Sequence, residues 1–335
     1  MRACTPRPPA ALAPGAEPAP GYEVLAHLTR TGWLDVYDAW SVERACRCVI
    51  KTVRPDRRDE KRLRERLLRE GGWLREFTHP HLTRAYETFE SPEPLVVLET
   101  LTGETLSHLV HRLRRRPGAA DVALLGVQLC SAIHYLHGRG LLHLDVKPSN
   151  VVVDCGHAKV LDLSVARPPG PAPAGVGTRG YLAPEQARGG PLTAAADVWG
   201  IGVTLFEVAC GDVPFPRDDD HARAARAARA ANGANGENGA NGANGENGEN
   251  GDGPSTGHER REGCERCDGA GEGTGSTGGW YPQLNRSAPP IGSRRRLPSA
   301  VADAVDACLR ADPSSRPAVD DLAAALRSAL PAPPR

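Results

Sequence analysis

The stretch LLHLDVKPSN, residues 141 to 150, places three chemically distinct polar side chains directly after an apolar run. Asp145 can accept a proton or a hydrogen bond, Lys147 carries a compact positive charge, and Asn150 offers an amide oxygen to a metal ion. Such spacing would let one loop aim a base, a cation and a metal ligand at a single reacting group. The residue before the carboxylate, Leu144, is apolar and carries no charge into this loop.

Lysine is rare in this chain, and this gives each lysine position weight. Only four of the 41 basic residues are lysines, and the others are arginines. Ammonium and guanidinium groups differ in shape and hydration, so a lysine retained in such a chain indicates a position where arginine cannot substitute. Lys51 and Lys147 are two of the four.

The residues before LLHLDVKPSN are expected to form a sheet and a helix. Three short runs rich in β-branched and aromatic residues, YEVLAHL, WLDVYDAW and CRCVIKTV, predict an antiparallel sheet. The next segment, KRLRERLLREGGWLREF, predicts a helix with one apolar stripe formed by Leu63, Leu67, Leu74 and Phe77. Glu70 lies on that stripe, and a buried carboxylate needs a partner. Lys51, at the end of the third run, is the natural partner; alternatively, Glu70 lies at the edge of the stripe and reaches water.

Composition restricts the class of protein. Lys plus Arg and Asp plus Glu both number 41 in 335 residues, so neither a nucleic-acid partner nor a membrane surface is expected. Nine irregularly spaced cysteines predict reduced thiols in a cytoplasmic protein. The N-terminal residues lack the apolar core of a signal peptide, and the apolar run VWGIGVTLFEVAC is too short to span a bilayer.

Composition also divides the chain. Residues 1–20 form a Pro/Ala-rich tail that is expected to be disordered. At about residues 231–279 the sequence becomes an ANG/ENG repeat with a Gly-rich continuation, which has almost nothing apolar to bury and predicts a solvated insert. Apolar residues recur at helical spacing from Leu297 to about Leu330, so a single domain interrupted by an insert is expected.

The ordered set of motifs resembles the eukaryotic-type protein kinases, most closely their bacterial Ser/Thr branch. A strand lysine and a helix glutamate are followed by HLDVKPSN, LDLS, GTRGYLAPE, DVWGIGVTLFEVACGDVPF and DPSSRP. The resemblance covers roughly residues 22–330. It implies an α+β, bilobal fold: an N-lobe at 21–101 with a small antiparallel sheet and one key helix, and a larger, mainly helical C-lobe at 102–330 that carries the insert.

The resemblance further implies transfer of the ATP γ-phosphoryl group to Ser or Thr hydroxyls of a protein substrate, with Mg²⁺. Lys51 would hold the α- and β-phosphates, and Glu70 would hold Lys51. Asp145 would orient the substrate hydroxyl, and Lys147 would contact the γ-phosphate.

The remaining implied residues bind metal, bind the nucleotide or support the site. Magnesium would be coordinated by Asn150 and Asp162. The nucleotide site would also include Val36, Val49, Glu99, Leu101 and Val152. Structural roles are implied for His143, Asp197, Glu185, Arg316 and Thr178.

The chain departs from the family pattern in two places that would contact phosphate or metal. Thr29, Thr31 and Leu34 stand where a glycine-rich loop has its three glycines, and side chains there obstruct the approach of backbone amides to phosphate. The metal motif Asp-Phe-Gly is replaced by Asp162-Leu163-Ser164. Two functions follow: an active Ser/Thr kinase, favoured because every charged or amide group of the mechanism is retained, or a pseudokinase that acts as a scaffold. A small-molecule kinase is disfavoured by GTRGYLAPE.

Leu144 also departs from most regulated kinases, in which an arginine precedes the catalytic aspartate and pairs with a phosphate on the activation loop. Leucine offers no charge for such a phosphate. Between Asp162 and Glu185 the hydroxyl groups belong to Ser164, Thr178 and Tyr181 alone. We therefore expect an activation loop that is not switched by phosphorylation.

A last motif lies in the insert. CERCDGAG is similar to one zinc knuckle of the J-domain chaperones, and Cys264, Cys267 and a possible His258 would supply fewer than the four ligands of a tetrahedral site. The alternative is a Gly-rich loop that happens to contain two cysteines.

Overall fold

The structure is a computed structural model that describes residues 9–113, 115–216 and 281–331. Apart from Pro216, the described residues belong to one compact unit. The predicted insert at about 231–279, with Cys264 and Cys267, lies outside them.

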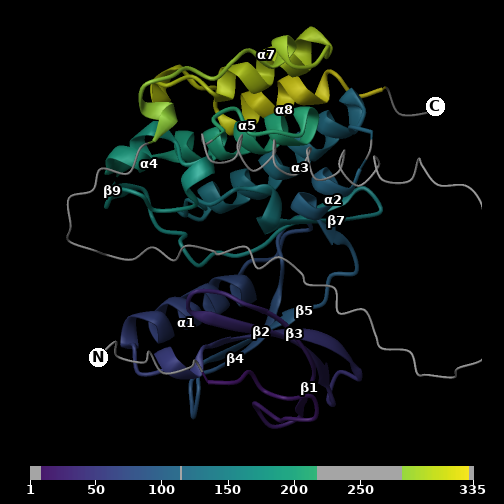
Figure 1. The fold of residues 1–335 in the computed structure, drawn as a ribbon, viewed down its shortest axis with the longest axis vertical. Coiled ribbons are helices and arrows are strands. Elements are labelled where there is room, and N and C mark those ends of the chain that lie inside the picture. The colour runs from purple at the N-terminus through teal and green to yellow at the C-terminus, as the bar shows by residue number, and fades with distance from the viewer. Residues whose placement is uncertain (1–8, 114, 217–280, 332–335) are drawn as a thin grey trace, which may run out of the picture. The chain divides into compact units, whose positions relative to one another are not determined.

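A five-stranded antiparallel sheet forms the N-terminal part of this unit (Figure 1). Its strand order is β1-β2-β3-β5-β4, and the three runs predicted as strands are confirmed as its first three members. The strands are β1 (Tyr22–Arg30), β2 (Leu34–Ser41), β3 (Cys46–Val53), β4 (Ala85–Phe89) and β5 (Leu95–Glu99). In this register Lys51 of β3 lies between Val36 of β2 and Val96 of β5. Lys51 is thereby placed on a strand with a partner on either side.

The predicted helix is α1 (Lys61–Glu76), which buries Leu63, Leu67, Leu74 and also Glu70. Gly71 allows this helix to approach the sheet closely. A Cβ atom there would lie 2.5 Å from Thr88 Cγ2 and 2.6 Å from Val96 Cγ2. The glycine that weakens the isolated helix therefore serves the packing that brings Glu70 to the sheet.

The described part of the tail expected to be disordered packs on the sheet instead. Gly15 N donates to Val24 O and Val24 N donates to Ala16 O, both at 2.8 Å, while Leu12 N donates to the Tyr37 hydroxyl at 3.1 Å. Small apolar residues of this segment, among them the buried Ala19, cover a second core cluster under β1, β2 and β3. A Pro/Ala-rich composition lacks large apolar side chains, but here its backbone pairs with a strand and its methyl groups find an apolar surface.

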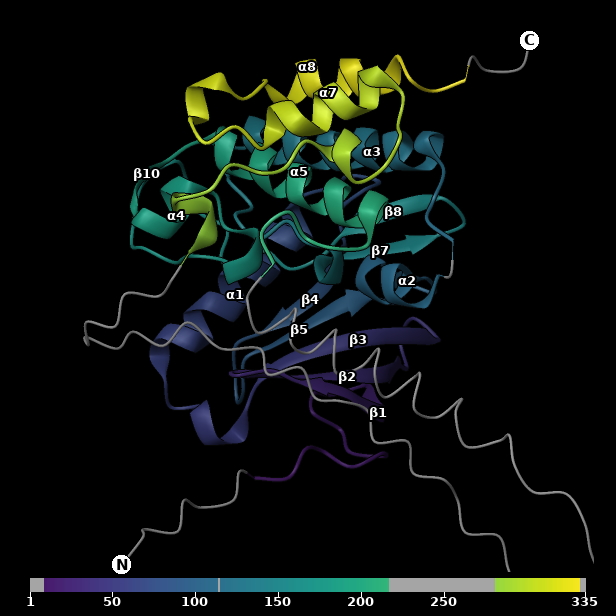
Figure 2. The same cartoon turned by 45° about the horizontal axis from the view of Figure 1, so that its top comes forward.

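Four helices form the core of the C-terminal part (Figure 2). They are α3 (Ala119–Gly138), α5 (Ala194–Cys210), α7 (Ser299–Cys308) and α8 (Val319–Arg327). α3 contacts α5 and α8, and α7 contacts the same two helices. Among the described helices α3 has the length and composition to cross a membrane. Its apolar residues Val122, Leu129, Ile133 and Leu136 are fully buried in the protein, as in a core helix.

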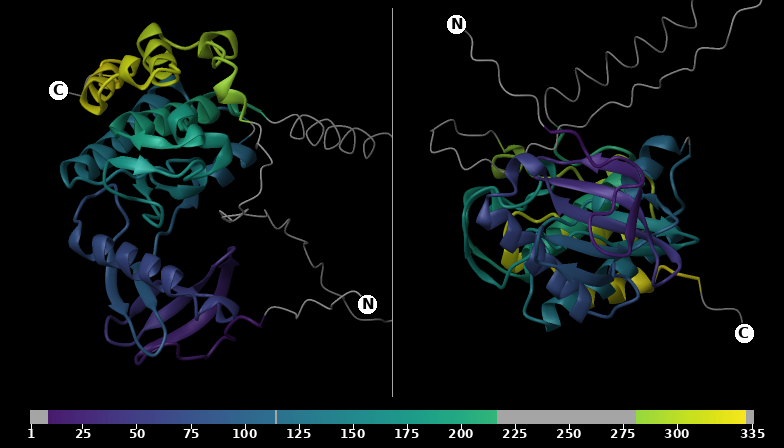
Figure 3. Two further views of the ribbon diagram at one scale, coloured as in Figure 1. Left: turned by 90° about the vertical axis from the view of Figure 1, so that its left-hand side faces the viewer. Right: turned by 90° about the horizontal axis from the view of Figure 1, so that it is seen from below.

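Short strands, teal in Figure 3, lie on the side of the helical part that faces the five-stranded sheet. β6 (Glu104–Thr105), β7 (Val151–Asp154) and β8 (His157–Val160) form a small sheet beside α2 (Leu106–Arg112), and β9 (Gly170–Ala172) pairs with β10 (Gly190–Leu192), next to α4 (Pro184–Arg188). Val151 at the start of β7 pairs with Val160 at the end of β8. This register brings Asn150, just before β7, close to the motif that begins at Asp162.

Candidate active site

The ion pair predicted between β3 and α1 is present. Lys51 Nζ lies 2.7 Å from Glu70 Oε1 and 3.9 Å from Asp162 Oδ1. Burial opposes the charge on Lys51, but Asp162 and Glu70 outweigh this effect and raise its pKa above the ordinary value. Burial raises the pKa of Glu70, and Lys51 opposes that rise. Lys51 is therefore a firmly held cation between two carboxylates.

The loop from residue 143 to 150 holds one side of the Asp145 carboxylate and leaves the other side without a partner. Lys147 Nζ and Asn150 Nδ2 each lie 3.0 Å from Asp145 Oδ2. Asp145 Oδ1 is buried and has no hydrogen-bond partner among the described residues. Such a fixed carboxylate with one unsatisfied oxygen is suited to accept a hydrogen bond from an incoming hydroxyl group.

The backbone of this loop is held by buried side chains. Asp197 accepts from His143 N at 2.9 Å and from Leu144 N at 2.6 Å. Gln186 Nε2 donates to Leu144 O at 2.9 Å. Leu144 has φ +65°, a left-handed conformation that costs a non-glycine residue about 1–3 kcal/mol. Hydrogen bonds to both of its peptide groups hold Leu144 in this conformation, and Asp145 follows directly.

The motif at 162–164 keeps a carboxylate in anionic form. Asp162 has φ +62°, and Ser164 N donates to its Oδ1 at 2.9 Å. Burial would raise the pKa of Asp162, but Lys51 and Ser164 lower it well below the ordinary value. Asp162 is thus charged at neutral pH and can ligate a cation.

Of the five residues predicted around the nucleotide base, two line one pocket. A pocket of about 270 Å³ is lined by Leu101 and Val152 together with Thr100, Thr102, Asp154, Cys155, His157 and Lys159. Glu99 lies beside it, with Lys159 Nζ and Arg84 N donating to its Oε1. Val36 and Val49 belong to the sheet, opposite Lys51 and Leu98 respectively, and do not line this pocket.

The residues with implied structural roles make contacts within the C-terminal part. Arg316 donates from Nη1 and Nη2 to the two Glu185 oxygens at 2.6 and 2.9 Å. Lys147 Nζ donates to Thr178 Oγ1 at 2.5 Å. His143, Leu74 and Leu163 are at most 1% exposed.

The positions of the three missing glycines differ from one another. Thr29 is exposed near the end of β1, whereas Leu34 is 4% exposed and belongs to the main core cluster. Thr31 begins the turn, and its hydroxyl accepts from Leu34 N at 3.0 Å. At the base of the turn the buried Asp35 accepts from Arg30 Nε and Nη2 at 2.6 and 2.8 Å. The loop is therefore a short, side-chain-bonded turn.

Comparison with known proteins agrees with this geometry. The family described as protein kinase domain matches residues 22–326. This chain belongs to the protein kinase family. Among curated bacterial Ser/Thr kinases, PknB of Mycobacterium leprae is 31% identical over 59% of this chain and 33% of its own length. RqkA of Deinococcus radiodurans, a DNA damage-responsive kinase, is 32% identical over 63% of this chain and 33% of its own. The chain thus spans about one third of the relatives it matches.

A solved structure supports the fold. The PknI kinase domain of Mycobacterium tuberculosis, in a cysteine-to-alanine mutant form, has a TM-score of 0.63 and 17% identity, covering 95% of this chain and 99% of its own. The bilobal kinase fold, with an antiparallel N-lobe sheet and a helical C-lobe, is confirmed. As identity is low, this likeness concerns the fold alone.

The donor set of this site fits Mg²⁺ and a nucleotide. Asn150 Nδ2 donates to the Asp145 carbonyl and carboxylate oxygens, which leaves Asn150 Oδ1 as the atom that can ligate a metal. Together with anionic Asp162 it supplies oxygen ligands, which magnesium prefers. Lys51 supplies a cation for phosphate, and Thr100 Oγ1 is buried without a partner among the described residues, next to the pocket at Leu101.

Two residues that contact the motifs of the site were not predicted from the sequence. Gln186 contacts the catalytic loop through the Leu144 carbonyl. Arg66 donates from Nε to the Ser164 carbonyl at 2.7 Å. Arg66 precedes Glu70 by one helical turn on α1, and this spacing was the available signal.

Proposed function

We propose that this chain is a Ser/Thr protein kinase domain that transfers the ATP γ-phosphoryl group to hydroxyl groups of a protein substrate. The observation that carries the proposal is the Asp145 carboxylate, with Oδ2 fixed by Lys147 and Asn150 and Oδ1 buried without a partner among the described residues. Family membership and the Ser/Thr kinases among its relatives support the same activity.

The chain's own residues have separable tasks in this reaction. Bound MgATP would supply the phosphoryl group and a divalent charge that neutralises its oxygens. Lys51 would bind the α- and β-phosphates, and Asp162 with Asn150 would hold the metal. Asp145 Oδ1 would accept the hydrogen bond of the substrate hydroxyl and orient its oxygen towards phosphorus, while Lys147 would stabilise charge on the γ-phosphate.

We further propose that the activation loop needs no phosphate. Its three hydroxyl groups are already engaged: Ser164 Oγ accepts from Arg66 at 3.1 Å, Thr178 Oγ1 accepts from Lys147, and the Tyr181 hydroxyl donates to Glu207 at 2.7 Å. β9 anchors the middle of the loop to β10, and Gln186 donates to Val176 O at 2.9 Å. Contacts within the protein therefore support the path of the loop, which a phosphate organises in regulated kinases.

The test is a transfer assay with purified protein, labelled ATP, Mg²⁺ and a generic basic protein. Lys51→Met and Asp145→Asn should each abolish transfer, while Asp145→Asn still binds nucleotide because it leaves the phosphate-binding lysine in place. Wild-type transfer no higher than that of either variant would instead support the pseudokinase function.

A cytoplasmic location stays a prediction from the cysteine usage.

A further inference from the structure

The turn between β1 and β2 engages its own N–H groups. Thr31 N donates to Leu34 O at 2.8 Å, and Leu34 N donates to Thr31 Oγ1 at 3.0 Å. Trp33 N donates to the same hydroxyl at 3.4 Å. These are amides that a glycine-rich loop would turn towards phosphate. In this chain they close the turn instead.

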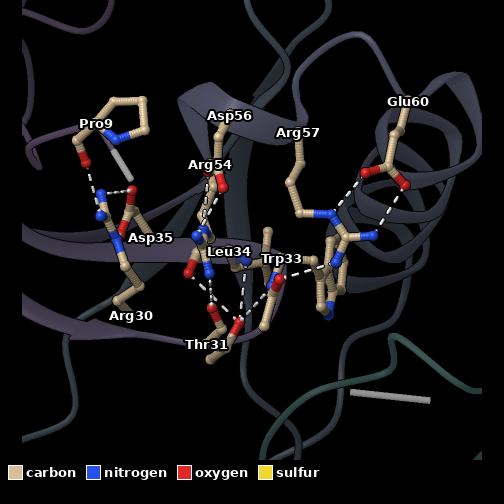
Figure 4. Close-up of polar contacts among 11 residues, drawn as sticks. Pro9, Arg30, Thr31, Trp33, Leu34, Asp35, Arg54, Asp56, Arg57 and Glu60 are labelled. Atoms are coloured by element: carbon tan, nitrogen blue, oxygen red, sulfur yellow. Dashed lines mark hydrogen bonds and ion pairs between the residues drawn. The ribbon is translucent and has the colours of Figure 1, made fainter. Parts of the chain in front are cut away.

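Two arginines from the segment that follows β3 bind the carbonyl groups of the same turn (Figure 4). Arg54 Nη1 donates to Thr31 O at 3.1 Å, and Arg57 Nη1 donates to Gly32 O at 2.9 Å. The turn is therefore held on its amide side by a hydroxyl and on its carbonyl side by two guanidinium groups.

Carboxylates fix both arginines in place. Arg54 donates from Nε and Nη2 to the two oxygens of Asp56 at 3.0 and 2.7 Å. Arg57 donates in the same way to Glu60 at 2.6 and 2.9 Å. A planar guanidinium bound by two parallel hydrogen bonds has a defined orientation, so its remaining nitrogen points in a fixed direction. Figure 4 shows both forks beside the turn.

The turn carries Trp33 to a half-buried arginine on α1, Arg66. The Arg66 guanidinium carbon lies 4.5 Å from the centroid of the Trp33 ring, within the range of a cation–π contact. Arg66 and Glu70 are one helical turn apart, so the same side of α1 faces both the turn and Lys51. Burial lowers the pKa of Arg66, and Asp162 and Glu70 oppose this effect.

Arg66 in turn holds the metal motif at two atoms. Its Nε donates to Ser164 O at 2.7 Å, and its Nη2 donates to Ser164 Oγ at 3.1 Å. Ser164 N donates to Asp162 Oδ1 at 2.9 Å. A continuous set of contacts therefore joins the turn to Asp162, and a glycine at position 164 would lack the hydroxyl that takes the second bond.

We propose that Arg66 is a positioning residue which fixes Asp162 through Ser164, and that the locked β1–β2 turn serves to hold Arg66 by means of Trp33. The chain departs from the family pattern by its missing glycines and by Ser164 in place of glycine. Both departures then serve to hold Asp162 in place. The inference rests on the proposed function only in taking Asp162 as the metal ligand.

α1 offers a matched control for the experiment. Arg69 stacks on Trp73 with its guanidinium carbon 5.5 Å from the ring centroid, so the same helix carries a second arginine–tryptophan pair. The test variants are Arg66→Met, Trp33→Leu and the smaller Ser164→Ala. The controls are Arg69→Met and Trp73→Leu. All are compared in the full chain.

The first readout is amide hydrogen exchange of the peptide spanning residues 160–168, without nucleotide or metal. Arg66→Met should raise exchange there about tenfold, the equivalent of one lost charged hydrogen bond. Trp33→Leu and Ser164→Ala should raise it by smaller factors, and the controls should match wild type. The second readout is calorimetric binding of ATP. Arg66→Met should weaken binding in Mg²⁺ about tenfold and leave binding in EDTA unchanged.

Equal exchange in Arg66→Met and Arg69→Met would overturn the proposal, as would an equal loss of ATP binding with and without Mg²⁺. If Arg66→Met does not fold, Ser164→Ala and Trp33→Leu decide the question by the same exchange measurement. Wild-type protein that binds no ATP would refute the proposed function, whereas the exchange readout would still decide whether Arg66 holds the motif.

Discussion

The Lys51 ammonium lies 2.7 Å from Oε1 of Glu70, whose side chain is fully buried and whose second oxygen has no hydrogen-bond partner among the described residues. Glu70 thus depends on one cation. Lys51→Met should lower the free energy of unfolding by about 3–5 kcal/mol at neutral pH, because it leaves a buried carboxylate without compensation. Urea unfolding measures this, and the double variant Lys51→Met/Glu70→Leu should recover most of the loss. A Lys51→Met protein as stable as wild type would contradict this prediction.

The same pair predicts a pH dependence. Burial already raises the pKa of Glu70 and Lys51 opposes that rise, so Lys51→Met should raise the folded-state pKa further. A carboxyl group with a raised folded-state pKa contributes stability that is present below its unfolded value and is lost as pH rises through the folded value. The difference in unfolding free energy between wild type and Lys51→Met should therefore be smaller at pH 5 than at pH 8. Urea unfolding at pH 5 and at pH 8 measures this difference, and a larger difference at pH 5 would contradict the prediction.

Restoring glycine at Leu34 and at Thr29 should have two different effects. Leu34 is 4% exposed in the core, so Leu34→Gly should cost about 3 kcal/mol or more of stability. Thr29 is exposed on β1, and Thr29→Gly should tighten MgATP binding by up to about tenfold, the equivalent of one regained charged hydrogen bond. Calorimetric titration with MgATP measures the affinity. The control is Glu23→Gly, at an exposed position on the same strand. Unchanged or weaker MgATP binding by Thr29→Gly would show that the Thr29 side chain does not obstruct the nucleotide.

Phosphatase treatment should leave the turnover of the purified protein unchanged, because the three activation-loop hydroxyl groups are engaged in contacts with other side chains. The measurement is the initial rate before and after treatment, with mass spectrometry of the peptides from residue 162 to 185. A large fall in the initial rate, together with a phosphosite mapped between residues 162 and 185, would contradict the prediction. Thr178→Val is not a suitable control for the unphosphorylated loop, because it also removes the hydroxyl group to which Lys147 donates.

Deletion of residues 231–279 should leave folding and catalysis nearly intact. Loop-closure entropy rises only logarithmically with loop length, so a long solvated segment changes stability little. Contacts also anchor both sides of the insert: Phe215 stacks on Trp199 with ring centroids 5.6 Å apart, and Gln283 donates to Leu182 O at 3.1 Å. Soluble yield, the unfolding midpoint and the transfer rate are compared with the full chain. An insoluble deletion protein would mean that the insert packs.

Local patterns were sufficient for the parts of the site that depend on one element or one loop. The helical period placed Glu70 on the buried side of α1, and the motif order placed the catalytic loop and Asp162. β-branched runs gave the first three strands with bounds close to those observed. These features follow from spacing along the chain.

Other features depend on contacts that spacing does not encode. The close approach at Gly71 requires β4 and β5 to lie against α1, which no property of the helix alone predicts. Residues 9–20 look disordered by composition, and they pack because β1 offers them backbone partners. Gln186 and Arg66 act on loops far away in the sequence, 42 and 98 residues from their acceptors. Their roles become visible only when the loops are folded together.

The state of the lysines makes the protein convenient to label. Lys51, Lys147 and Lys159 are at most 29% exposed in their ion pairs. Lys61, the remaining lysine, is 88% exposed at the start of α1 and lies 3.6 Å from the exposed Glu65. An amine-reactive dye will therefore modify Lys61 in preference to the other three lysines. A fluorophore at Lys61 sits on the helix that carries Arg66 and Glu70, so it can report movements of that helix when nucleotide is added, with no engineered cysteine.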